Sequence, residues 1–515
     1  MPSRTMLTQA AVYAVVAVAL LAVISGVGPG MVVGGGGGDF PSIAWGLWRA
    51  AEALPGLPSV QTDLIFAPRG ASIFLADLPE TLLLAPLTAL VGPVATFNLL
   101  QLAHPALAMA TMFLLLRTEG RGAAAAAGGG AAFGLSPTLL TGIHNGNPDV
   151  TPLYLLPLVA LAVRRLDRSW AAAGLAGVLI GLCPWFNPYV GVMAAVVAVV
   201  MASYRRPDRL LLAAGIALAV AGVYASLVLS SFSTSDAMVH KPGGPTASVP
   251  AGVAHLKGFF LPVLEAQRDD WSLHGWYLGA LGLLTALLAG RGELRRPLLL
   301  LGAGLALSMG PVLQVDTLTP LTPGGWRIAL PGALLVDLPG ISALRIAYRF
   351  AALVALGLAP LIARGIDRLP RSGRPVLAVL IAVELLAVGA PLLEAGPRPS
   401  TEACDLLAEH AAGPVIDLPS ERDEIHLLTQ SCHGFPVAQG INQPYPRAIQ
   451  QAAHKGTRAF NALSKHEFRY LILHFDQIQD EPTRQQLVLL KAHAESQGRI
   501  LGQTEQTVLI GLGTW

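Results

Sequence analysis

Residues 8–51 read TQAAVYAVVAVALLAVISGVGPGMVVGGGGGDFPSIAWGLWRAA, and the order of features in this stretch indicates the fold. Residues 8–27 form an apolar run of the length, roughly 20 residues, that a helix needs to cross a bilayer. The glycines at 34–38 then give a backbone that bends sharply and approaches other groups closely, and they lead to a lone acidic residue, Asp39. We therefore expect a retained membrane anchor that brings a carboxylate to the membrane surface.

A second helix is predicted directly after this glycine loop. Ile43, Leu47 and Trp48 recur at helical spacing, and Trp45 lies close by. This pattern is typical of an amphipathic helix in the membrane interface, where tryptophan is enriched. Residues 81–92 are apolar but too short to span a bilayer, so they predict a second interfacial helix.

The composition of the whole chain favours a membrane protein and excludes two other classes. Of the 515 residues, 53% are hydrophobic and only 13% are charged, whereas an ordinary soluble domain carries about 25% charged residues. The net charge of +2 gives no basic footprint for nucleic acid. Residues 401–515 carry 22 of the 66 charges, which predicts a membrane domain, 1–393, followed by a soluble domain, 394–515.

The hydrophobic runs predict about eleven membrane spans. They lie near 8–27, 94–116, 122–140, 150–163, 170–183, 190–203, 210–231, 276–290, 297–313, 346–363 and 375–393. Arginines concentrate in alternate loops, which the positive-inside rule places in the cytoplasm together with the N-terminus. The first loop, 28–93, and the C-terminal domain then lie outside, as in a multi-pass plasma (inner) membrane protein.

The soluble tail has the pattern of a small α/β unit, so the predicted fold class is mainly α: a polytopic transmembrane helical bundle with a C-terminal α/β domain. Residues 413–419 and 467–475 predict buried strands, 481–498 a helix, and 499–511 a last strand or hairpin. The histidines of this tail show no ligand spacing, which favours scattered surface histidines over a metal site. Cys404 and Cys432 either pair as a disulfide in an oxidising compartment or remain unrelated thiols.

Asp39 admits two interpretations. Its carboxylate acts as a general base on an acceptor hydroxyl, or holds a divalent cation such as Mg²⁺ or Mn²⁺ that bridges a phosphate. Alternatively, Asp39 is a solvated loop residue that caps the following helix. Asp77 and Glu80, further along the same loop, are candidates for a second acid.

Two other outside segments carry candidate groups. Residues 144–149 read HNGNPD and concentrate polar side chains, although Asn-Gly and Asn-Pro are also ordinary turn formers. Arg345 and Arg349 are four residues apart on one helix face. They either clamp a lipid-linked phosphate or extend to the headgroups as ordinary anchors.

Taken in order, these features resemble the GT-C superfamily of integral membrane glycosyltransferases, and most closely its glycosyltransferase-39-like and dolichyl-phosphate-mannose-mannosyltransferase-like bacterial members. The order is a first span, an acidic outside loop with tryptophan-containing helices, further spans and an outside α/β tail. The local matches are Gly38-Asp39 with Trp45 and Trp48, Pro68-Arg69-Gly70, Asn98 in FNLL, the segment Leu344-Arg345 to Arg349-Phe350, and VIDLP and FRYLILH in the tail.

The resemblance implies transfer of a sugar from a polyprenyl-phosphate donor to a lipid, glycan or protein acceptor at the outer membrane face. It implies that Asp39 is the catalytic base, that the leaving phosphate is bound by arginine, and that transfer inverts the anomeric carbon. The substrate-binding candidates are Arg69, His144, Asn147, Arg345 and Arg349. Family members often have two adjacent acids, whereas Gly38 and Phe40 flank Asp39, so the second acid falls to Asp77, Glu80 or Asp149.

Two other classes of function remain open on the sequence. A transporter or flippase of a lipid-linked glycan is one, although no repeat relates the two halves and the ionisable groups cluster outside the predicted spans. A non-catalytic membrane scaffold whose outside domain binds a partner is the other.

Overall fold

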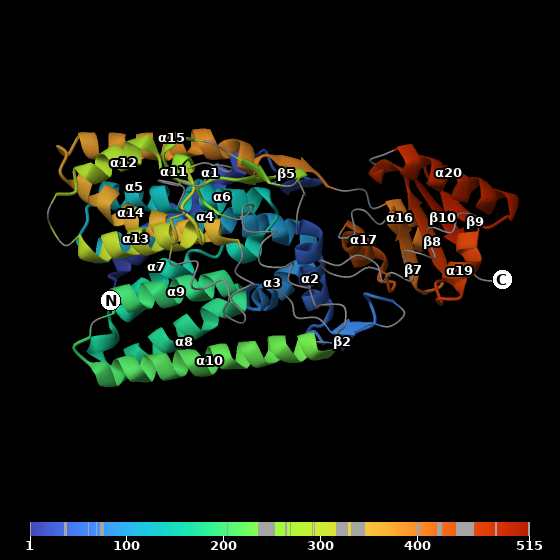
Figure 1. The fold of residues 1–515 in the computed structure, drawn as a ribbon, viewed down its shortest axis with the longest axis horizontal. Helices are drawn as coiled ribbons and strands as arrows, with labels where there is room; N and C mark the ends of the chain where they lie inside the picture. Colours follow the sequence, from blue (N-terminus) through green and yellow to red (C-terminus); the bar gives the residue numbers. More distant parts are fainter. Residues whose placement is uncertain are drawn as a thin grey trace.

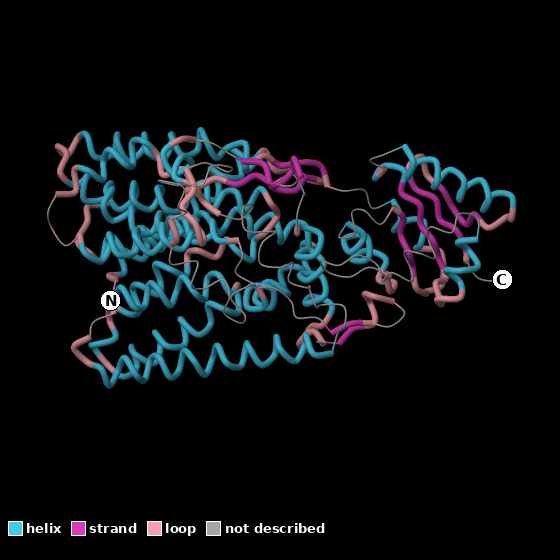
Figure 2. The backbone as a smooth tube through the Cα atoms, viewed as in Figure 1, coloured by secondary structure: helices cyan, strands magenta, loops and turns pink. Residues whose placement is uncertain are grey.

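The computed structural model places the helices in one elongated bundle and a small α/β unit beyond one end of it (Figure 1). Strands gather mainly in that C-terminal unit, with short pairs elsewhere (Figure 2). The structure describes residues 2–34, 39–59, 61–67, 70–72, 77–202, 204–234, 253–262, 265–267, 269–290, 292, 294–315, 328–330, 346–398, 402–419, 425–438, 458–478 and 481–512.

A helix lies in each of the eleven segments in which a span is predicted. The helices are α1 (Arg4–Ser25), α4 (Pro93–Thr118), α5 (Ala123–Gly134), α6 (Pro137–His144), α7 (Leu155–Val163), α8 (Trp170–Phe186), α9 (Pro188–Met201), α10 (Pro207–Thr234), α12 (Ala280–Leu287), α13 (Arg295–Ser308), α14 (Ala351–Asp367) and α15 (Gly373–Leu393). Within the described residues, five helices are long and apolar enough to cross a membrane, or six if the bent pair α5–α6 is one span. The count of eleven therefore stays a prediction, because several of these helices are short.

The bundle has buried and exposed helices, as expected of a protein surrounded by lipid. Of the most apolar window in each helix, 78% is buried for α4 but only 6% for α10. Glycines allow the central helices to approach closely: a Cβ at Gly130 of α5 would lie 2.7 Å from the carbonyl oxygen of Met109 in α4. The exposed apolar side chains of α1 and α10 are then the ones that face lipid.

The loop after α1 contains strand β1 (Met31–Val33), helix α2 (Phe40–Glu52), strands β2 (Gln61–Thr62) and β3 (Ala71–Ser72), and helix α3 (Leu78–Val91). β1 pairs with β6 (Ala395–Pro397), the first strand after α15. The first loop is therefore joined to the segment that leads out of the bundle.

The C-terminal unit is a four-stranded sheet with helices around it. Its strand order is β7-β8-β10-β9, with β7 parallel to β8 and the other neighbours antiparallel. The strands are β7 (Val415–Leu418), β8 (Tyr470–His474), β9 (Ile500–Gln503) and β10 (Thr507–Gly511), and the helices are α16 (Glu402–Leu407), α17 (Ile425–His433), α19 (Ala459–Ser464) and α20 (Glu481–Ser496). β7, β8 and α20 lie within the segments expected to form strands and a helix.

Helix α2 contacts α17 of the C-terminal unit, which corrects the prediction that α2 lies in the membrane interface. Phe40, Trp45 and Leu47 are completely buried inside the protein. The indole N–H of Trp45 donates a 2.6 Å hydrogen bond to Oε1 of Gln430 in α17. The apolar face of α2 is thus covered by protein, because the C-terminal unit folds back onto the first loop.

Candidate functional site

The stretch before Asp39 is held in place by Asn98 of α4. Its side chain accepts a 2.9 Å hydrogen bond from the Val33 N–H and donates a 2.9 Å hydrogen bond to the Met31 carbonyl. Gly34 follows with a φ of +79°, and a Cβ there would lie 2.4 Å from the carbonyl oxygen of Ile143. Only glycine fits this contact, which holds the first loop against the end of α6, beside His144.

Asp39 stands at the first turn of α2 but does not cap it. Its backbone carbonyl accepts the first helical hydrogen bond, from Ile43, while its side chain makes no capping hydrogen bond. The carboxylate is partly exposed and acts electrostatically on the hydroxyl of Tyr348. Asp39 therefore occupies the N-cap position without a side-chain capping bond, and its carboxylate lies within electrostatic range of Tyr348, the neighbour of Arg349.

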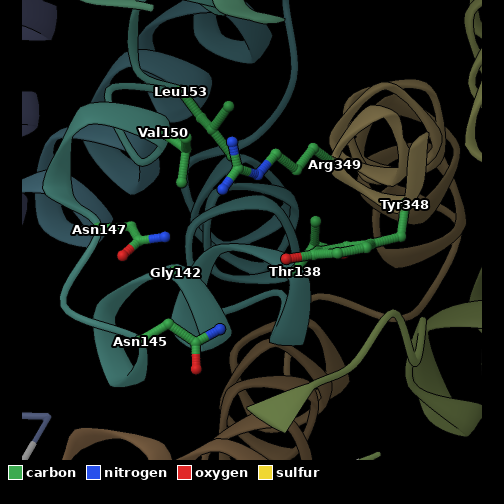
Figure 3. A pocket seen from close by; sticks show the side chains of 8 residues that line it. All are labelled: Thr138, Gly142, Asn145, Asn147, Val150, Leu153, Tyr348 and Arg349. Carbon is green, nitrogen blue, oxygen red and sulfur yellow. The ribbon is translucent and has the colours of Figure 1, made fainter. Parts of the chain in front are cut away.

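Tyr348 and Arg349 belong to a short 3-10 helix, η7 (Ala347–Phe350), that leads into α14. Both side chains enter a small pocket from one side, and Asn145 and Asn147 approach it from the other (Figure 3). The remaining lining residues are Thr138, Gly142, Val150 and Leu153. The pocket therefore joins the polar turn after α6 to the arginine segment, two regions that the sequence singled out separately.

Arg349 is positioned by an aromatic ring. Its guanidinium carbon lies 4.9 Å from the centroid of the Tyr189 ring, a favourable cation–π distance. The Tyr189 hydroxyl in turn accepts a 2.8 Å hydrogen bond from the Ile346 N–H. Nε of Arg349 is buried and makes no hydrogen bond. Arg349 thus presents a fixed cation with unused hydrogen-bonding capacity.

Asp149 lies in a 3-10 turn, η1 (Pro148–Val150), and interacts electrostatically with Arg349. Its Oδ2 accepts a 2.7 Å hydrogen bond from Asn187, whereas its Oδ1 is buried without a hydrogen bond. Burial raises the pKa of Asp149 above that of an ordinary aspartate, although the Arg349 guanidinium acts in the opposite direction.

A buried hydrogen-bonded network adjoins Asp149. His104, inside α4, has Nε2 at 2.8 Å from Oε2 of Glu80 and Nδ1 at 2.6 Å from the Thr151 hydroxyl. The Tyr154 hydroxyl donates to Oε1 of Glu80. We call these four residues (Glu80, His104, Thr151 and Tyr154) the Glu80 network.

The pKa values of Asp77 and Glu80 shift in opposite directions although the two residues are neighbours. Burial and the Glu80 carboxylate raise the pKa of Asp77 well above its usual value. Burial alone would raise the pKa of Glu80 too, but His104 and the hydrogen-bond donors outweigh it and hold the pKa at about 2. The carboxyl of Asp77 also lies within electrostatic range of Asp149.

The structure gathers most of the candidate site residues into one neighbourhood. Asp39 interacts electrostatically with Tyr348, and Tyr348 interacts with Arg349. Arg349 in turn interacts with Asp149, and Asp149 interacts with Asp77. Asn147 lines the pocket, while His144 lies beside Gly34 and is not among the lining residues. Arg69 and Arg345 lie outside the described residues.

The sequence missed His104, Tyr154, Asn187, Tyr189 and Tyr348. His104 carried a signal, because an ionisable residue in the middle of a predicted span is rare and marks an internal polar contact. The other four are ordinary helix or helix-end residues whose role depends on tertiary packing.

The residues of this neighbourhood suit an anion better than a cation. In the described part of the bundle, no three Asp, Glu, His or Cys side chains bring ligand atoms close enough to share a metal ion. The Asp149 carboxylate instead interacts with the Arg349 guanidinium, which binds phosphate well. This neighbourhood therefore suits a phosphate group better than a divalent cation.

Arginines from several predicted cytoplasmic loops meet elsewhere in the bundle. Arg121, Arg164, Arg295, Arg296 and Arg364 line one cavity together with Glu119. These arginines come from four different loops, so the four loops lie on the same side of the bundle. Their common location agrees with the grouping that the positive-inside rule predicts.

The C-terminal unit contains a second buried cluster of ionisable groups. Asp417 of β7, His426 of α17 and His474 of β8 are exposed by only 1%, 0% and 3%. The prediction of scattered surface histidines is wrong for these two, because the sheet and α17 enclose them. Burial lowers the pKa of His426 to about 4, although Asp417 acts in the opposite direction, so this imidazole is neutral at pH 7.

Cys404 and Cys432 form a disulfide with their Cα atoms 6.0 Å apart. This bond links α16 to α17, the helix that also carries His426 and Gln430. The third cysteine, Cys183, is buried in α8 as a free thiol.

Comparison with solved structures identifies the fold. The arabinofuranosyltransferase AftD from Mycobacteria matches 98% of this chain and 40% of its own, at 17% identity and a TM-score of 0.59. The oligosaccharyltransferase of Archaeoglobus fulgidus matches 94% of this chain and 71% of its own, at 14% identity and a TM-score of 0.51. The chain thus spans well under half the length of AftD. No protein-family model matches the sequence, and no curated protein sequence matches it.

These likenesses, together with the apolar helices, define the class: a multi-pass membrane protein with a mainly helical fold. More particularly, the chain shares the fold of these two solved transferases, which agrees with the fold that the GT-C resemblance drawn from the sequence implies. The resemblance drawn from the sequence is therefore confirmed at the level of the fold.

Proposed function

We propose that this protein is a glycosyltransferase that takes a sugar from a polyprenyl-phosphate donor at the outer face of the membrane. The observation that carries the proposal is Arg349, a cation with a buried, unbonded Nε at a pocket close to Asp149 and Tyr348. Tyr348 in turn lies within electrostatic range of Asp39. A GT-C fold with a guanidinium and a carboxylate at one site supports transfer from a phosphate-linked sugar.

The proposed reaction is an inverting displacement. Asp39 removes the proton from an acceptor hydroxyl, whose oxygen forms a bond to the anomeric carbon as the bond from that carbon to the phosphate oxygen breaks. The polyprenyl phosphate leaves with the electron pair of the broken bond, and Arg349 stabilises its negative charge. Asp149 positions Arg349, while Asn147 and His144, with Arg69 and Arg345, contact the substrates. The acceptor is a lipid, glycan or protein.

The same proposal fixes the orientation of the chain. The N-terminus and the arginine-lined cavity face the cytoplasm, and the first loop and the C-terminal unit lie outside, in the plasma (inner) membrane of a bacterial cell. The clustering of arginines from four loops supports this orientation.

An acid of the bundle, Glu384, joins two helices through hydrogen bonds. Glu384 of α15 accepts hydrogen bonds from the Tyr277 hydroxyl at 2.7 Å and from the Ala280 N–H at 2.6 Å. It also accepts a 3.0 Å bond from the Leu281 N–H and so binds the start of α12. Glu384 therefore links α15 to the start of α12.

The test is transfer by the purified full-length protein, offered a panel of polyprenyl-phosphate sugars in membrane-like vesicles. We expect Asp39→Asn and Arg349→Gln each to lower the rate by roughly 100-fold or more, because each removes charge needed at the reacting centre. Asp63→Asn is the matched control, since Asp63 is an exposed acid of the same loop. Full activity of Asp39→Asn would exclude Asp39 as the base. Transport of the donor without transfer would support a flippase instead.

A further inference from the structure

We propose that Asp417, His426 and His474 form a binding site for a divalent transition metal, Zn²⁺ in the first place, in the C-terminal unit. This site is separate from the proposed transferase site.

The fold brings the three residues together from distant parts of the chain. β7 and β8 are parallel, and Asp417 pairs in register with Ile472. His474 lies two residues further along β8, so it projects from the same face of the sheet as Asp417. His426 reaches that face from the first turn of α17. The carboxyl ends of parallel strands are a common location for ligand sites in α/β structures.

The distances between the potential ligand atoms suit one ion. Oδ1 of Asp417 lies 2.8 Å from Nε2 of His474 and 3.7 Å from Nδ1 of His426. All three atoms lie within 4.8 Å of one another. Ligand atoms about 2.0–2.1 Å from a tetrahedral Zn²⁺ are roughly 3.3 Å apart. Side-chain rotations that lengthen the 2.8 Å distance and shorten the 3.7 Å distance by about half an ångström each bring these two pairs of atoms to that spacing.

The hydrogen bonding of His426 supplies an independent reason for a cation. Its Nε2 lies 3.2 Å from the Pro419 carbonyl, which can only accept, so the ring proton is on Nε2. Nδ1 then presents a lone pair, and it is buried without a hydrogen bond, facing the Asp417 carboxylate. A metal ion between the two groups would give the Nδ1 lone pair of His426 a partner. A ligating histidine whose other N–H binds a backbone carbonyl is the usual arrangement in metal sites.

His433 provides a matched comparison on the same helix. Its Nδ1 accepts a 2.9 Å hydrogen bond from the Phe435 N–H, so a neutral ring carries its proton on Nε2. That protonated Nε2 cannot ligate a metal. His433 is therefore outside the proposed ligand set although it lies two turns from His426.

The experiment measures metal content and spectrum in the full-length protein, purified in detergent without a polyhistidine tag and stripped with a chelator. After incubation with Zn²⁺ and removal of unbound metal, we expect one equivalent per chain in the wild type and in His433→Gln. We expect His426→Gln and Asp417→Asn to weaken binding by roughly 10- to 100-fold or more. Equal zinc content in wild type and His426→Gln would overturn the proposal.

Co²⁺ keeps the test decisive even where a variant fails to fold. Bound to the stripped wild-type protein in a tetrahedral site, Co²⁺ gives strong visible absorption that excess Zn²⁺ abolishes. A spectrum no different from that of aqueous Co²⁺ would show that the three residues form only a hydrogen-bonded cluster, and would exclude the site. The outcome is independent of glycosyl transfer, so failure of one proposal leaves the other standing.

Discussion

The protein contains two buried pairs of histidine and carboxylate with the same separation and different surroundings. His104 and Glu80 in the bundle are 2.8 Å apart, as are His474 and Asp417 in the C-terminal unit. In the bundle both ring nitrogens of His104 and both oxygens of Glu80 have partners. In the C-terminal unit, His426 adds a ring nitrogen that no hydrogen bond satisfies. A saturated network supports the fold, whereas an unsaturated one of the same residue types is suited to a ligand.

The largest expected effect comes from breaking the Glu80 network. Replacing His104 with leucine leaves the Glu80 carboxylate buried without its main partner, and we expect a loss of about 3–5 kcal/mol of stability. Thermal unfolding in detergent measures it. The double variant Glu80→Leu, His104→Leu removes both members of the pair and is expected to recover part of the loss. Wild-type stability of His104→Leu alone would contradict the view of this network as a structural support.

The second largest effect is expected from loss of the Cys404–Cys432 disulfide. This bond lies in the C-terminal unit, with the His474–Asp417 pair. Cys404 and Cys432 are 28 residues apart in sequence, and a crosslink across a loop of that length contributes about 3.6 kcal/mol. We expect Cys404→Ser to lower the unfolding temperature of the C-terminal unit and to weaken Zn²⁺ binding, because α17 loses its link to α16. Cys432→Ser and the double variant are the controls and are expected to match it. A larger loss in the double variant would mean that the cysteines act separately.

Zinc is expected to stabilise the C-terminal unit and not the helical bundle. At a free Zn²⁺ concentration of 100 times the dissociation constant, a ligand that binds only the folded state adds about 2.7 kcal/mol. We expect that increase in wild-type protein and in His104→Leu, and an increase of about 1.4 kcal/mol or less in His426→Gln, whose Zn²⁺ binding is at least 10-fold weaker. Unfolding curves of chelator-treated protein with and without Zn²⁺ test this. An increase in His426→Gln as large as that of the wild type would place the metal elsewhere.

The smallest effect is expected from Tyr154→Phe. This change deletes one hydroxyl that donates to Glu80 and leaves His104 in place, so we expect a loss of about 1.5 kcal/mol. Tyr204→Phe is the control, because its exposed hydroxyl donates only to the Val199 carbonyl. A loss for Tyr154→Phe as large as that for His104→Leu would show that the tyrosine, not the histidine, holds the network together.

The sequence predicted the helical bundle because hydropathy depends on composition alone, and it selected Asp39, Asp149 and Arg349 because charges outside the arginine-rich loops are scarce. It did not predict that Asp39 and Arg349 would lie in one neighbourhood of the structure, since the two residues are close to opposite ends of the membrane domain in the sequence. The cluster of Asp417 and His474 was missed for a similar reason: parallel strand pairing joins them across 57 positions. The burial of α2 was missed because it depends on α17.

The pairing of β1 with β6 has a consequence for biosynthesis. β1 emerges from the ribosome directly after the first helix, but its partner strand emerges only after α15, the last long apolar helix. Throughout synthesis of the bundle, the segment that leads to Asp39 therefore lacks its strand partner, and Trp45 lacks the side chain of Gln430. The packing around the segment that leads to Asp39 is thus completed only after the last long apolar helix has been synthesised.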